Sequence, residues 1–245
     1  MKITNPMVFQ PTCLNDFVIG DKGTSDTLRL ILDGTIPFPN GGKTGILLYG
    51  PVGTGKSALL KHLPLFLEHR LNPEAIESYM KIVTCRHATT SQQLRDSMRG
   101  AELVPFGVNY HYFVLDELDQ LPSAIQADLK VIMEHKQSVF VMATNHIERI
   151  NAAILSRCHV LAFEPAPAEM WLPMATKFLA DNGVSGIPDD ALLSVIERCN
   201  GDARNITHML NDTVAKWPAT TASQPQSAPP SPVVPVLTQD SLIIG

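Results

Sequence analysis

Short apolar runs alternate with amphipathic segments through the first two thirds of the chain. The apolar runs predict five strands, at residues 45–49, 80–85, 112–115, 139–143 and 160–163. Apolar positions at helical spacing predict helices over most of the intervals, notably 56–69, 91–98 and 123–135, and an earlier helix over 25–32. Strands that are apolar throughout and separated by helices favour a sheet covered on both faces. The pattern predicts an α/β fold with a parallel five-stranded sheet.

The pattern changes around Pro165, after which no further strand is predicted. Three helical patterns follow, over residues 168–181, 189–199 and 202–217, and they indicate a small three-helix lid. From Pro218 to Pro235 the chain is mostly Pro, Ala, Ser, Thr, Gln and Val without periodicity, which is typical of a disordered tail, and a short apolar end follows at residues 241–245. We therefore divide the chain into a core over 1–165, a lid over 166–217 and a tail over 218–245.

A glycine-rich run lies between the first predicted strand and the helix that follows it. It fits the pattern G-x-x-x-x-G-K-[ST] and reads Gly50-Pro51-Val52-Gly53-Thr54-Gly55-Lys56-Ser57. The glycines let the backbone curl so that several N–H groups, with the helix N-terminus behind them, point at phosphate groups. Lys56 is expected to reach the β- and γ-phosphates and the Ser57 hydroxyl to hold Mg²⁺. The sequence therefore predicts a nucleoside triphosphate site formed by Gly50, Gly53, Thr54, Gly55, Lys56 and Ser57.

Two carboxylates, Asp116 and Glu117, directly follow the predicted strand 112–115. In a parallel sheet this end of the strand faces the nucleotide. Asp116 can orient Mg²⁺, and Glu117 can polarise the water that attacks the γ-phosphate. We interpret the nearby Asp119 as a cap or a solvated turn residue.

Three more polar residues, Asn145, Arg157 and Arg204, leave two interpretations each. Asn145 can position the attacking water or sense the γ-phosphate, or it can simply cap a turn. Arg157 can stabilise charge on a γ-phosphate. Because Lys56 and Mg²⁺ already serve the chain's own site, that phosphate would belong to a neighbouring subunit. The alternative is that Arg157 forms a surface salt bridge. Arg204 can reach back from the last lid helix to the phosphates, or it is a plain solvated arginine, although the helix dipole slightly disfavours it in a first turn.

Together these motifs resemble an AAA+ ATPase of the clamp-loader clade, the small subunits of replication factor C and their phage counterparts. The resemblance extends from about Asp16 to Trp217. It implies that the nucleotide is ATP and that it is hydrolysed between the subunits of a homo- or hetero-oligomer. Val18 and Ile19 fall in a segment that looks like the family's adenine pocket.

The resemblance also implies roles for the three polar residues. Asn145 falls at the sensor 1 position, and Ser156-Arg157-Cys158 is similar to the Ser-Arg-Cys box that supplies an arginine finger to the neighbouring subunit. The run Gly201-Asp202-Ala203-Arg204 looks like the box that carries sensor 2.

The chain departs from the family in ways that affect the implied activity. A Pro/Ser-rich tail stands where clamp-loader subunits usually continue into a collar domain, the Tyr-Arg-Pro upstream of the adenine segment appears as Phe9-Gln10-Pro11, and the zinc insertion of bacterial relatives is absent. ATP hydrolysis at a subunit interface therefore carries over better than the loading of a sliding clamp. The favoured role is a clamp-loader-like motor that acts on DNA or replication partners; the alternative is a nucleotide-switched adaptor, a helicase loader or mobile-element regulator with little ATP turnover.

Composition limits the partners of the chain. The net charge of −5 over 245 residues gives no general basic surface for nucleic acid. Local DNA contacts are expected at the helix starts near Ser91 and Ser123, with Arg95, Arg99 and Lys130 nearby, and ordinary capped helices are the alternative. The tail segment Gln239–Ile243 resembles a sliding-clamp-binding peptide, or it is merely a disordered end.

The four cysteines are widely spaced without a C-x-x-C pair, which favours free thiols over a zinc site or disulfides. We expect a cytoplasmic protein without a membrane segment, because the sequence shows neither a signal peptide nor an apolar run of about 18 residues.

Overall fold

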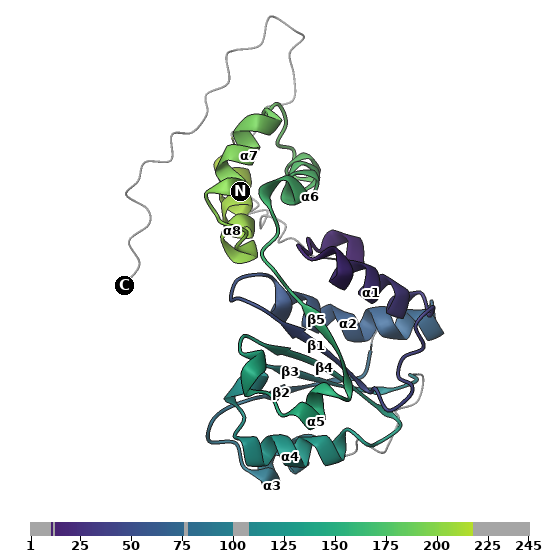
Figure 1. Ribbon diagram of the computed structural model, residues 1–245. Coiled ribbons are helices and arrows are strands. Elements are labelled where there is room, and N and C mark those ends of the chain that lie inside the picture. Colours follow the sequence, from purple (N-terminus) through teal and green to yellow (C-terminus); the bar gives the residue numbers. More distant parts are fainter. Residues whose placement is uncertain (1–10, 12, 76–77, 100–107, 218–245) are drawn as a thin grey trace, which may run out of the picture.

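The computed structural model describes residues 11, 13–75, 78–99 and 108–217. Its strands form one parallel sheet in the order β2-β3-β4-β1-β5 (Figure 1). The strand bounds are β1 Gly45–Tyr49, β2 Met80–Thr84, β3 His111–Asp116, β4 Ser138–Thr144 and β5 Cys158–Ala162. The sheet confirms the predicted α/β fold with five parallel strands, and each strand differs from its predicted range by at most two residues at either end.

Helices cover both faces of the sheet (Figure 1). One face carries α1 (Lys22–Leu32) and α2 (Lys56–Leu71), and the other carries α3 (Ser91–Ser97), α4 (Ser123–Ile132) and α5 (Ala152–Leu155). Because β1, β3 and β4 are buried from both sides, they are apolar at nearly every position rather than at every second one.

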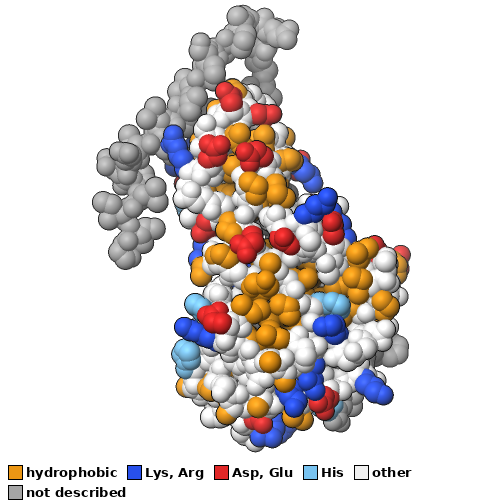
Figure 2. All heavy atoms as spheres, in the orientation of Figure 1, with side chains coloured by type: hydrophobic (Ala, Val, Ile, Leu, Met, Phe, Trp, Pro, Cys, Tyr) orange, Lys and Arg blue, Asp and Glu red, His pale blue; other side chains and the backbone are white. Residues whose placement is uncertain are grey.

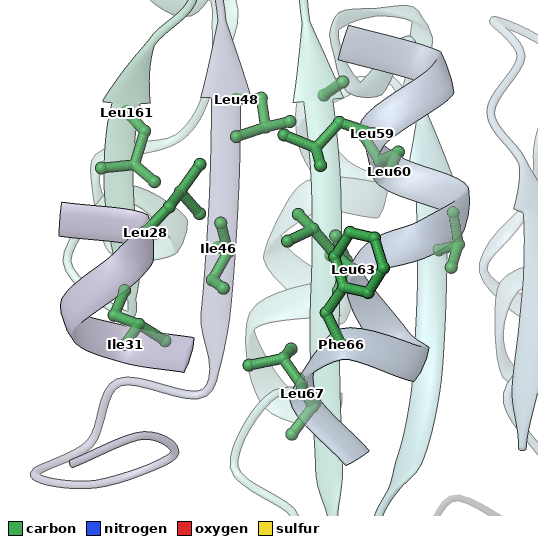
Figure 3. Packing of buried hydrophobic residues seen from close by; sticks show 14 of the residues in the cluster. Leu28, Ile31, Ile46, Leu48, Leu59, Leu60, Leu63, Phe66, Leu67 and Leu161 are labelled. Carbon is green, nitrogen blue, oxygen red and sulfur yellow. The ribbon is translucent and has the colours of Figure 1, made fainter. Parts of the chain in front are cut away.

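The packing between the sheet and the first pair of helices is shown in Figure 3. Leu28 and Ile31 of α1 and Leu63 of α2 are fully buried in the same cluster as Ile46 and Leu48 of β1. Leu28 and Ile31 are three residues apart, which places them on one face of α1, and Ile46 and Leu48 are two residues apart, which places them on one face of β1. The spacing of apolar residues in the sequence therefore corresponds to the faces that are in contact. The cluster fixes α2, and with it the loop that precedes α2, against the sheet.

Three helices follow the sheet: α6 (Ala168–Asp181), α7 (Asp189–Glu197) and α8 (Ala203–Lys216). They have a hydrophobic core of their own, which includes Trp171, Phe178, Leu192, Ile206 and Leu210. The division of the chain at residues 165 and 166 stays a prediction.

The three helices contact the core next to the phosphate loop. The N–H of Ala203, the first residue of α8, donates to the carbonyl of Gly53 at 2.7 Å. Val18 packs against the hydrophobic cluster of the lid, whereas its neighbour Ile19 is buried in the core cluster of α1 and α2. The start of α8 therefore lies directly over the phosphate loop.

Short 3₁₀ helices lie in the described loops at η1 (Leu14–Asp16), η2 (Leu118–Gln120) and η3 (Ile147–Arg149). Among the residues that the structure describes, no helix has both the length and the apolar character needed to cross a membrane. The predicted tail and its segment Gln239–Ile243 lie outside the described residues.

Candidate functional site

A hollow of about 320 Å³ opens at the carboxyl ends of β1, β3 and β4, beneath the start of α8. Carboxyl ends of parallel strands meet at one edge of a sheet, so loops that are distant in the sequence line it together. The lining residues are Val52, Gly53, Thr54, Gly55, Lys56, Ser57, Ala58, Asp116, Glu117, Thr144, Asn145, Ala203, Arg204 and Thr207. The structure thus brings most of the predicted site residues into one cavity.

The phosphate loop adopts a backbone that favours glycine at three of its positions, and at one of them, Gly55, the φ angle is 95°. Gly50 and Gly53 have φ angles of 149° and 88°, in the region that favours glycine. A Cβ on Gly50 would collide with the carbonyl oxygen of Phe163, and a Cβ on Gly53 would collide with the Asp202 carboxylate. The loop can therefore pass between β5 and the lid only as a bare backbone.

Within the described part of the chain, the backbone N–H groups of residues 52–57 donate to no protein acceptor. Unpaired N–H groups in a curled loop at a helix N-terminus form a ready site for an anion. The donors present therefore fit the phosphates of a nucleotide.

Lys56 is the charged group of this loop, and its side chain is buried. Its Nζ atom donates to the carbonyl oxygens of Gly50 at 2.8 Å and Pro51 at 2.6 Å. Burial lowers the pKa of Lys56, and the negative charges of Asp116 and Asp119 oppose that shift. The ammonium is thus held inside the loop, where it can exchange these carbonyl bonds for bonds to phosphate oxygens.

The two predicted carboxylates lie where β3 ends. Asp116 is its last residue, and its carboxylate accepts a hydrogen bond from the Glu117 N–H at 2.9 Å. Glu117 has φ 53° and ψ 48°, a left-handed conformation that is uncommon for a residue with a long side chain. Such backbone outliers cluster at functional sites, and this one leaves the Glu117 side chain exposed on the wall of the cavity.

The interpretation of Asp119 as a cap or a solvated turn residue is wrong. Its side chain is only 6% exposed and accepts hydrogen bonds from the Thr144 hydroxyl at 2.7 Å and from the Asn145 N–H at 3.3 Å. The contact joins the loop after β3 to the end of β4, which is the neighbouring strand in the sheet. No local pattern could reveal it, because it depends on which strand lies beside β3.

Asn145 itself lies beside the cavity with its backbone fixed by Asp119. Among the described residues its side-chain amide has no hydrogen-bond partner, so the amide is available to a water or a ligand. No hydrogen bond between the Asn145 side chain and a described residue supports the alternative of a turn-capping asparagine.

Gln126 is a buried polar residue for which the sequence predicted no role. It is 2% exposed, donates to the carbonyls of Leu121 and Arg149, both at 3.1 Å, and accepts from the Asn151 N–H at 2.8 Å. It therefore ties the start of α4 to the loop that leads into α5. In the sequence, the sign of this role is a polar residue at a helical position that would otherwise be apolar.

The two predicted arginines differ in position. Arg204 lines the cavity, is exposed and forms no side-chain bond with a described residue, so its charge is available. Arg157 does not line the cavity: its guanidinium donates to the Glu134 carboxylate at 2.8 Å and to the Ala153 carbonyl at 3.0 Å. The surface salt bridge considered as its alternative is therefore present in the structure.

The remaining predicted contacts lie around the cavity rather than in its wall. Gly50 belongs to the loop through the bond from Lys56, and its own N–H donates to Thr144 at 3.3 Å. Val18 and Ile19 are not among the lining residues, and Ile19 is only 4% exposed.

A phosphate loop, a carboxylate pair and a polar strand end around one cavity of a parallel sheet define a P-loop nucleotide-binding fold. The family model described as "AAA domain (dynein-related subfamily)" matches residues 45–176. The chain belongs to the AAA family.

Subunits of replication factor C are similar in sequence to this chain. "Replication factor C small subunit 1" of Pyrobaculum aerophilum is 29% identical over 174 residues, which is 69% of this chain and 51% of that protein. "Replication factor C subunit 3" of Saccharomyces cerevisiae is 25% identical over 217 residues, which is 84% of this chain and 58% of that protein. The chain therefore spans between half and three fifths of the length of these two relatives. The predicted resemblance to replication factor C small subunits is confirmed.

A solved structure agrees with the fold. The Thermotoga maritima RuvB Holliday junction branch migration motor has a TM-score of 0.60 and 18% identity, and the match covers 78% of this chain and 61% of that one. At this identity the likeness supports the fold alone.

Proposed function

We propose that this chain binds ATP with Mg²⁺ and hydrolyses it as one subunit of an AAA+ oligomer. The observation that carries the proposal is the composition of one cavity. It combines unpaired loop N–H groups with the ammonium of Lys56, the carboxylates of Asp116 and Glu117 and the free amide of Asn145. This is the set of groups that phosphoryl transfer to water requires.

Each residue has a role that follows from its place. The loop N–H groups and Lys56 bind the phosphates, and the Ser57 hydroxyl and Asp116 hold Mg²⁺, which neutralises charge on the phosphate oxygens. Glu117 orients and polarises the attacking water, which the Asn145 amide helps to place. Arg204 contributes a positive charge from the lid and links the angle of the lid to the nucleotide.

The adenine is proposed to lie beside Val18. This residue is half-buried and packs against the hydrophobic cluster of the lid, as does Ala203, whose N–H bonds the phosphate loop. Ile19 supports it from within the core cluster. An apolar surface shared by the core and the lid suits the flat, apolar face of a purine ring.

Arg157 is proposed to act on the nucleotide of a neighbouring subunit. Its guanidinium lies outside the cavity of its own chain and is held at the surface by Glu134. An arginine supplied in trans can stabilise the charge that develops on the transferred phosphoryl group. This role requires an oligomer of AAA+ subunits.

DNA is proposed as a partner because the relatives are replication proteins by name. The candidate contact helices α3 and α4 lie side by side, and Thr90 caps the start of α3. Two of the candidate basic residues are paired, Arg95 with Asp128 at 3.9 Å and Arg99 with Asp96 at 3.1 Å. Basic and acidic side chains are also mixed over the face shown in Figure 2, so contacts would be few and directed at phosphates.

The substitution Glu117→Gln tests the assignment of the site. The amide keeps the shape of the side chain but cannot polarise water, so ATP affinity should stay within about threefold while turnover falls by about 10²-fold or more. Fluorescent-nucleotide titration measures the first quantity and phosphate release the second. Hydrolysis at the wild-type rate would refute the catalytic role of Glu117.

Mixing two inactive variants tests the role of Arg157. In an Arg157→Ala oligomer every pocket keeps Glu117 but receives no arginine, whereas in a Glu117→Gln oligomer every pocket lacks the carboxylate. An equimolar mixture contains interfaces at which a Glu117→Gln subunit donates Arg157 to an intact pocket. The mixture should therefore hydrolyse ATP at least tenfold faster than either variant alone, since such an arginine contributes about 10³-fold or more.

A further inference from the structure

The segment Lys43-Thr44-Gly45, where the chain enters β1, binds the backbone on both sides of Arg157. Lys43 Nζ donates to the carbonyl of Cys158 at 2.6 Å and to that of Ser156 at 3.4 Å. The N–H groups of Thr44 and Gly45 both donate to the carbonyl of Arg157 at 3.0 Å. Three consecutive carbonyls of the Ser-Arg-Cys run are therefore held from one short segment.

The same segment also holds the partner of the arginine. The Thr44 hydroxyl donates to the carbonyl of Met133 at 2.9 Å, and the next residue, Glu134, accepts the hydrogen bond from the Arg157 guanidinium. The backbone that presents the arginine and the backbone that presents its carboxylate are thus both anchored to residues 43–45.

Close packing reinforces these bonds. A Cβ on Gly45 would lie 2.6 Å from the Cys158 sulfur, so any larger residue at this position would displace the Cys158 side chain. Such an arrangement leaves the backbone at Arg157 little freedom to shift.

The guanidinium of Arg157 keeps N–H donors that no described residue uses. An arginine has five N–H donors, and among the described residues Arg157 uses one for Glu134 and one for Ala153. Its side chain is 24% exposed. The donors that remain, carried on a fixed backbone, are suited to a phosphate approaching from outside the subunit.

The ammonium of Lys43 donates to carbonyl oxygens rather than to the carboxylate of a described residue. Among the described residues it forms no ion pair, and its half-buried ammonium donates to two carbonyls instead. Neither the pairing of β1 with β5 nor the burial of the core requires this, since backbone bonds already join the strands. Both of these carbonyls lie next to Arg157 in the sequence, on Ser156 and Cys158, so the bonds of the Lys43 side chain hold the backbone on either side of the arginine.

We infer that Lys43 is a positioning residue for Arg157: it fixes the backbone from which the arginine is offered to the neighbouring nucleotide. The inference rests on the proposed function of Arg157. Because β1 runs from this anchor straight into the phosphate loop, the arginine given to one neighbour and the chain's own nucleotide site lie at opposite ends of the same strand.

The test places Lys43→Met in one partner of the mixture described above. In the Glu117→Gln subunit, which donates the arginine, it should lower hydrolysis by the mixture by about tenfold, because a small displacement of a catalytic group is enough for such a loss. In the Arg157→Ala subunit, which only offers its pocket, it should leave at least half of the rate. Lys216→Met in the donor is the control, since Lys216 is an exposed lysine on α8 whose ion pair among the described residues is with Asp212 of the same helix.

The outcomes separate the two proposals. An equal loss from Lys43→Met in either partner would mean a merely structural role, and no loss in the donor would mean no role at all; both overturn the inference and leave the proposed function in place. A reference mixture without restored activity would contradict the donation of Arg157, and the inference would fall with it.

Discussion

Replacing Asp119 by alanine should destabilise the protein and slow hydrolysis together. The carboxylate is buried, and its removal leaves the Thr144 hydroxyl and the Asn145 N–H without their acceptor. A buried donor left unpaired costs about 1–3 kcal/mol. For two donors, and allowing for the relief of no longer burying a carboxylate, we expect unfolding to become easier by about 2–4 kcal/mol.

Urea unfolding without nucleotide measures this change, and two further variants divide it. Asp119→Asn keeps an acceptor oxygen of the same shape and should cost clearly less than Asp119→Ala. Thr144→Val removes the donor to Asp119 and also the acceptor of the His146 N–H, and it should cost about 1–3 kcal/mol. The double variant should show a coupling of about 1 kcal/mol with Asp119→Ala, because only the bond between the two side chains is lost in both single variants. Additive effects of Asp119→Ala and Thr144→Val would mean that the bond contributes nothing.

The effect on catalysis follows from Asn145. Because Asp119 fixes its backbone, the Asp119→Ala variant should let the amide move away from the cavity, lowering kcat by about tenfold or more while ATP affinity changes little. Phosphate release under saturating ATP gives kcat, and nucleotide titration gives the affinity. Wild-type stability together with wild-type kcat would mean that the buried hydrogen bonds of Asp119 neither stabilise the fold nor position Asn145.

Two further predictions concern the loop and the thiols. Gly53→Ala should abolish nucleotide binding in a titration, because Gly53 has a φ of 88° and an added Cβ would meet the Asp202 carboxylate; binding within threefold of wild type would contradict this. Burial raises the pKa of Cys85 and of Cys158 to about 12, so at pH 8 both stay thiols and should resist iodoacetamide, whereas the exposed Cys13 reacts. Mass spectrometry of the native and the urea-unfolded protein checks the order, and early labelling of Cys158 would contradict it.

Local chemistry made several features predictable from the sequence. The strands β1, β3 and β4 are apolar because they are buried on both faces, and the loop from Gly50 to Ser57 has the residues its backbone requires. The carboxylates after β3 and the polar end of β4 could be placed at one edge because parallel strands point the same way. The roles assigned to Asn145, Arg157 and Arg204 remain predictions for experiment.

The sequence by itself determined the elements, their class and the order of the chemical groups along the chain. Only the tertiary structure decided which groups meet: Asp119 with Thr144, and Lys43 with the backbone beside Arg157, more than 110 residues away. The physical reason is the strand order, which places β4 beside β3 and β5 beside β1. Apolar periodicity records that a strand is buried, but it does not record which strand lies next to it, and hydrogen bonds between loops depend on that neighbour.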